Sequence, residues 1–134
     1  MSSRESRLRA ILPGASRPRD ALAIAERGLA LARERGHRGS EAWTLRLLGE
    51  IVSRRTPPDV EAADGHYRPA MALAHELGMR PLHAHCCLGL GELHRHAGLR
   101  TRAREYLTTA SAMYREMGMD SWLTRAEAAV AAAP

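Results

Sequence analysis

The tripeptide Leu90-Gly91-Glu92 repeats Leu48-Gly49-Glu50 at a distance of 42 residues, and this repetition decides the fold. A second motif occurs three times, as LARERG at 31–36, LAHELG at 73–78 and MYREMG at 113–118. Its glycines are spaced by 42 and 40 residues. Two independent markers therefore share a period of about 40 residues, which is typical of helical-repeat proteins.

The composition favours helices over strands. Ile and Val together number only six in 134 residues and Phe is absent, whereas Ala, Leu, Arg and Glu dominate. These are strong helix formers, and the β-branched and aromatic residues that strands prefer are scarce. The sequence predicts a single all-α domain.

Each period divides into two helices. We expect first helices at 41–54 and 81–96 and second helices at 59–77 and 101–117. Three glycines fall just past helix ends, where a left-handed backbone costs glycine little, and we interpret them as stop signals: Gly36, Gly78 and Gly118. Side-chain oxygens are expected to cap the helix starts at Ser40, Thr56, Thr101 and Asp120.

Small residues indicate where helices cross. Gly49 and Gly91 lie inside the apolar stripes of the first helices, and a glycine there costs about 1 kcal/mol relative to alanine. We expect a second helix to pass each glycine at short distance. Pro69 interrupts one second helix and predicts a kink between Gly65 and Pro69, or else a helix that begins at Pro69.

These residues resemble the tetratricopeptide repeat (TPR) family. Leu-Gly on the first helix and small residues on the second match that family's pattern at Leu48-Gly49, Leu90-Gly91, Ala63, Ala70, Gly98, Ala103 and Ala110. Val52 and His94 depart from it, because the family prefers an aromatic at their position. The longer period resembles variants found in multidomain bacterial regulators, which implies a regulatory, signalling role.

The resemblance implies a short right-handed superhelical array of antiparallel helix hairpins with a C-terminal capping helix. We divide the chain into a degenerate repeat at 1–38, repeats at 39–80 and 81–119, and a capping helix at 120–133. The segment 5–12 is a poor first helix, because Arg9 stands where Gly49 and Gly91 stand later.

The resemblance also implies a non-enzymatic scaffold that binds a protein or peptide on its concave face, where the first helices lie. The residues of these helices that are not needed for packing are Trp43, Arg46, Glu50, Arg54, His85, Glu92, Arg95 and His96. An acidic partner is favoured, because arginine binds carboxylates and Trp and Arg dominate interface hot spots. The alternative is a solvated face with intrahelical pairs such as Arg46 with Glu50.

A histidine and cysteine cluster offers a metal-binding alternative, as a sensor or a structural site. Between residues 66 and 96 lie both cysteines, Cys86 and Cys87, and six of the seven histidines: His66, His75, His83, His85, His94 and His96. His83, Cys87 and His94 share nearly one helix face and could approach one ion. However, no paired metal motif is present, and Cys87 and His94 are needed for the core. We therefore expect no metal, no cofactor and no enzymatic activity.

Charge and hydropathy limit the other partners. The net charge of +5 comes from 20 basic residues, all arginine, against 15 acidic ones. Arginine-mediated nucleic-acid binding stays an alternative, but few aromatics are interleaved with the arginines.

No apolar run is long enough for a membrane span and residues 1–12 lack a signal-peptide pattern, so we expect a cytoplasmic protein. Its N-terminal end could contact a second copy or a larger parent protein.

Overall fold

The computed structural model describes residues 18–132 of the chain. These residues form only α-helices and turns, as the composition predicts. The helices are α2 (Pro18–Arg35), α3 (Arg38–Ser53), α4 (Val60–Glu76), α5 (Arg80–His96), α6 (Arg100–Met117) and α7 (Asp120–Ala132). The predicted poor helix at 5–12 lies outside the described residues.

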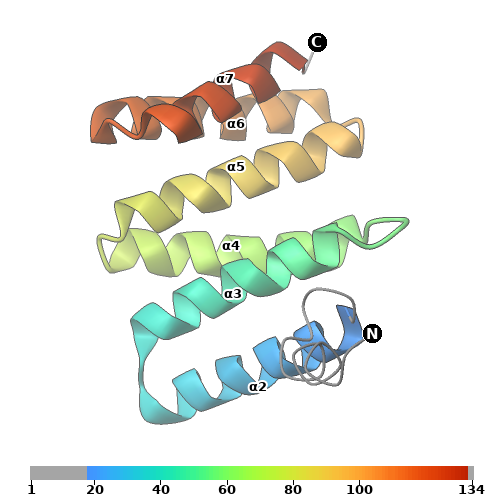
Figure 1. Cartoon of the computed structure of the whole chain (residues 1–134), viewed down its shortest axis with the longest axis vertical. Coiled ribbons are helices and arrows are strands. Elements are labelled where there is room, and N and C mark those ends of the chain that lie inside the picture. The colour runs from blue at the N-terminus through green and yellow to red at the C-terminus, as the bar shows by residue number, and fades with distance from the viewer. Residues whose placement is uncertain (1–17, 133–134) are drawn as a thin grey trace, which may run out of the picture.

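The helices stack in chain order along one axis. Each packs mainly against the helices that precede and follow it, and α3 also contacts α5 directly. Figure 1 shows α3, α5 and α7 on the near side, with α4 and α6 behind them. No helix in the described range 18–132 has the length and apolar character needed to cross a membrane.

Glycine ends the helices, as predicted for Gly36, Gly78 and Gly118. Each has a positive φ between 68° and 69°, and Gly98, which follows α5, has a φ of 78°. The residue after each glycine donates its backbone N–H to a carbonyl in the last helical turn, for example from Met79 to Ala74 at 2.8 Å. This arrangement satisfies carbonyls that would otherwise lack partners.

Three of the predicted helix starts are wrong. α3 begins at Arg38, so Ser40 lies inside the helix, and Thr101 likewise lies inside α6. The residue that caps the start of α4 is Asp59 and not Thr56. The Asp59 carboxylate accepts the Ala62 N–H at 3.0 Å. After each stop glycine the chain enters the next helix within two residues, so packing between helices outweighs the roughly 1 kcal/mol of a side-chain cap. Only α7 begins at its predicted residue, Asp120.

The core confirms the predicted helix crossings. A Cβ added at Gly49 would lie 2.9 Å from the Tyr67 ring, and one at Gly91 would lie 2.5 Å from the Leu107 side chain. The apolar stripes of the first helices and the residues that face them on the second helices are buried. They are Leu45, Leu48, Val52, Cys87, Leu90 and His94 on the first helices, and Ala63, Tyr67, Ala70, Ala74, Ala103, Leu107, Ala110 and Tyr114 on the second. Glycine therefore allows each pair of helices to approach closely.

α4 is one helix that passes through Pro69. It runs from Val60 to Glu76, so the alternative that it begins at Pro69 is wrong. Proline removes the hydrogen bond to the carbonyl four residues earlier, at Gly65. Both residues are exposed, so water can bind that carbonyl in place of the missing N–H.

Candidate functional site

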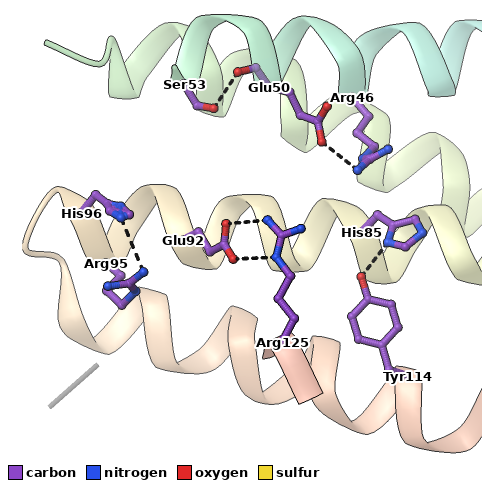
Figure 2. A network of polar contacts seen from close by, with 9 residues as sticks. All are labelled: Arg46, Glu50, Ser53, His85, Glu92, Arg95, His96, Tyr114 and Arg125. Carbon is purple, nitrogen blue, oxygen red and sulfur yellow. Dashed lines mark hydrogen bonds and ion pairs between the residues drawn. The ribbon is translucent and has the colours of Figure 1, made fainter. Parts of the chain in front are cut away.

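A groove with a volume of about 510 Å³ lies between α3, α5 and α7, and we call it the central groove. Its lining consists of Arg46, Glu50, Ser53, Arg54, Pro58, Tyr67, His85, Leu88, Gly89, Glu92, Leu93, His96, Trp122 and Arg125. Figure 2 shows the facing side chains of α3 and α5, with Arg125 reaching toward Glu92. The fold thus brings side chains from three separate periods of the sequence into one site.

Six of the eight predicted site residues line this groove: Arg46, Glu50, Arg54, His85, Glu92 and His96. Trp43 lies beside it, with its ring centre 6.4 Å from that of His85, and its side chain is 45% exposed. Arg95 is not part of the lining. Its Nη2 atom lies 3.5 Å from Nε2 of the neighbouring His96.

Two ion pairs hold the carboxylates of the groove. Arg46 donates to Glu50 at 2.7 Å within α3, as the solvated-face alternative predicted. Arg125 of α7 donates from Nε and Nη2 to the two oxygens of Glu92 on α5, at 3.3 Å each (Figure 2). The two carboxylates are therefore neutralised by the protein itself, and the groove keeps a net positive charge from Arg54.

Two arginines retain binding capacity toward the groove. Arg54 forms no ion pair with any residue in 18–132. The Nε atom of Arg46 is buried and has no hydrogen-bond partner. A buried donor without a partner costs free energy, so an acceptor group that reaches Arg46 would relieve that cost.

His85 is packed rather than free, which corrects the prediction that it projects from the concave face as a polar side chain. It is 8% exposed, and its Nδ1 atom forms a hydrogen bond of 2.6 Å with the Tyr114 hydroxyl. Its ring centre lies 4.4 Å from that of Trp122. Burial, and then the charges of Arg46 and Arg125, lower the pKa of His85 to about 4. The imidazole is therefore uncharged at pH 7 where it lines the groove.

Helix α7 contributes to the central groove, although the sequence predicted only that it caps the stack. Trp122 and Arg125 both line the groove, and the Arg125 guanidinium lies 5.4 Å from the centre of the Trp122 ring. The spacing of the repeats in the sequence already indicates this role of α7. Trp43, His85 and Arg125 each follow a stop glycine by seven residues, so α7 occupies the position of a further first helix.

The three residues that were expected to approach one ion, His83, Cys87 and His94, do not come together. Cys87 contacts Met71, with 3.7 Å between the sulfurs, whereas His94 lies against Asp64 with 3.3 Å from Nε2 to Oδ1. His83 faces a different histidine, His75. Within residues 18–132, no group of three or more His, Cys, Asp or Glu side chains is arranged to hold an ion.

Neither cysteine is activated as a nucleophile. Both thiols are free and buried. Burial raises the pKa of Cys86 to about 12 and that of Cys87 to about 11. Because the thiolate is the reactive form, both side chains behave as small hydrophobic groups at neutral pH.

Comparison with protein-family models and with curated proteins finds no match. The chemistry of the central groove therefore has to be inferred from its own residues.

Proposed function

We propose that this chain is a non-enzymatic, TPR-like interaction module that binds a protein or peptide partner in the central groove and thereby serves a regulatory role. The observation that carries the proposal is the groove itself, to which α3, α5 and α7 each contribute arginine or aromatic side chains. A surface built from equivalent positions of successive repeats is how solenoid proteins form extended binding sites.

The charges of the groove favour an acidic partner. Glu50 and Glu92 already have arginine partners. Among residues 18–132, Arg54 has no ion pair and the Nε donor of Arg46 has no partner. A carboxylate from a partner could accept hydrogen bonds from these two guanidinium groups. Charge-assisted hydrogen bonds of this kind are roughly twice as strong as neutral ones.

The aromatic residues favour an apolar side chain between the acidic ones. Trp122 lines the groove, and Trp43 lies at its edge with the Arg46 guanidinium 5.8 Å from its ring centre. Large aromatic residues beside arginine are typical of interface hot spots. A volume of about 510 Å³ accommodates a few side chains of a peptide.

Polar side chains of the groove take part in hydrogen bonds within the protein, which supports a binding role. The Ser53 hydroxyl donates to the Glu50 carbonyl at 2.8 Å. His85 is hydrogen-bonded to Tyr114 and stays neutral. These contacts support binding without chemistry.

Intrinsic fluorescence offers a direct test, because the only two tryptophans of the chain lie at the groove. Peptides without tryptophan that carry acidic residues on both sides of a Leu are compared with basic peptides of the same length. We expect the acidic peptides to change the emission and to bind more weakly as salt increases, since screening weakens exposed ion pairs.

Arg54→Glu provides the decisive variant, because Arg54 is exposed and has no ion pair in the described chain. It should weaken binding of the acidic peptide by roughly tenfold or more. Arg104→Glu on the exposed face of α6 makes the same charge change outside the groove and should have little effect. Equal affinities of the two variants, or preference for basic peptides, would refute the proposal.

A further inference from the structure

Two histidines face each other outside the central groove, at the turn between α4 and α5. The ring centres of His75 and His83 are 5.5 Å apart and their planes are inclined by 77°. Together with Met113 of α6 they line a second cavity of about 420 Å³, which also includes Ala74, Gly78 and Arg80. The central groove uses none of these side chains.

The spacing of the two rings suits chelation of one ion. Metal–nitrogen bonds of about 2.0–2.1 Å place each imidazole centre roughly 3.2 Å from the ion. Two ring centres 5.5 Å apart then correspond to a nitrogen–metal–nitrogen angle of about 120°. The helices α4 and α5 already hold the two ring centres at this distance.

The surroundings of the two histidines favour a soft ion. One helical turn away from them, Met71 on α4 and Cys87 on α5 form a second contact of the same two helices, with their sulfurs 3.7 Å apart. Met113, whose side chain carries a thioether, is one of the residues that line the cavity. Thioether and imidazole ligands together suit copper, and sulfur ligands select its Cu(I) state.

The charge of the cavity favours a monovalent ion over a divalent one. No carboxylate is part of its lining. The one charged lining residue, Arg80, is positive and donates to Glu116 at 2.5 Å. Neutral ligands beside a paired arginine provide little compensation for a divalent charge.

We propose that His75, His83 and Met113 form a binding site for Cu(I). This site goes beyond the proposed partner binding and is independent of it, because the cavity lies between α4, α5 and α6.

Competition with a coloured Cu(I) chelator tests the site. The full chain is titrated without oxygen into the Cu(I)–bicinchoninate complex in the presence of ascorbate, and loss of colour measures transfer of Cu(I). We expect one Cu(I) per chain. His75→Ala and His83→Ala should each weaken binding by roughly 100-fold or more, because losing a ligand exceeds the ~10–100-fold effect of losing an outer-shell partner.

Matched variants separate this site from other copper ligands. Met113→Leu keeps the packing volume but removes the sulfur, so it should weaken Cu(I) binding about tenfold. His66→Ala, a half-buried histidine on the same helix α4, should bind Cu(I) like the wild type. Circular dichroism confirms that each variant is folded.

Two outcomes would overturn the proposal. One is a wild-type chain that takes no Cu(I) from bicinchoninate. The other is a chain whose binding survives His75→Ala and His83→Ala but disappears with Cys87→Ala, because the thiols would then hold the ion. Peptide binding in the central groove is measured separately and does not depend on either result.

Discussion

The Tyr67 ring of α4 occupies the space that a side chain at Gly89 of α5 would need. A Cβ added at Gly89 would lie 2.6 Å from two carbon atoms of the ring, and Tyr67 is buried. The same ring lies against Gly49 of α3 on its other side. One aromatic side chain thus joins two helices that border the central groove.

Gly89→Ala should destabilise the fold although alanine is the better helix former. Overpacking costs about 1–3 kcal/mol, which exceeds the roughly 0.5–1 kcal/mol gained by replacing glycine in a helix. Gly65→Ala in α4 is the matched control, because its Cβ meets nothing within 4 Å. Urea unfolding should show a loss of stability for Gly89→Ala and a gain for Gly65→Ala. A gain in both variants would mean that Tyr67 does not constrain Gly89.

Stability should fall as the pH decreases from about 6.5 to 4. The pKa of His85 is lowered to about 4 in the folded state, so the unfolded chain binds a proton in this window that the folded chain does not. Each such histidine contributes a slope of about 1.4 kcal/mol per pH unit, and stability is fully present above pH 6.5. Burial also lowers the pKa of His66, His83 and His94, so these residues too make the folded state less stable as the pH decreases.

The His85→Asn variant isolates the contribution of one histidine to this slope. Asparagine can still hydrogen-bond the Tyr114 hydroxyl but does not titrate. Free energies of unfolding measured in urea between pH 7 and 4 should therefore decrease less steeply than in the wild type. An identical pH dependence of the two proteins would contradict the assignment of a neutral, buried His85.

Both cysteines should resist alkylation in the native protein. Cys86 and Cys87 are buried and their thiol pKa values are raised, so access and thiolate formation are both unfavourable. Labelling with iodoacetamide, followed by mass spectrometry, should modify both residues together and only as fast as the chain opens. Rapid labelling of one cysteine in folded protein would show that α5 opens locally at that position.

The two tryptophans should differ in their access to solvent. Trp43 is 45% exposed, whereas Trp122 is half-buried against His85 and Tyr114. Trp122→Phe leaves Trp43 as the only emitter and should give stronger acrylamide quenching than Trp43→Phe. Equal quenching in the two variants would argue against the packing of α7 on α5.

Much of the fold could be predicted because local patterns specify it. The predicted helix at 81–96 differs from α5 by one residue at its start, and the stop glycines have the expected positive φ. Only glycine enters the left-handed region at little cost, so its position in the sequence is informative without a structure. The helix starts were less predictable, because packing between helices, and not a capping side chain, decides where each helix begins. Ser40 and Thr101 therefore lie inside α3 and α6.

The candidate site could be predicted only in part, for a related reason. Periodicity places Arg46 and Glu92 on the same face of successive first helices, and both line the groove. It does not show that His85 contacts Tyr114, since that contact joins α5 to α6. The burial of His85 depends on this tertiary contact and on Trp122 of a third helix.

The sequence by itself determined the helical class, the period, the stop glycines and the small residues at the crossings, because each follows from local backbone preferences and residue size. Only the tertiary structure decided that Arg125 of α7 binds Glu92 of α5, and that His75 and His83 face each other across a turn. These relationships depend on the distances and rotations between packed helices. Such distances arise from the summed packing of many side chains, which no single stretch of sequence specifies.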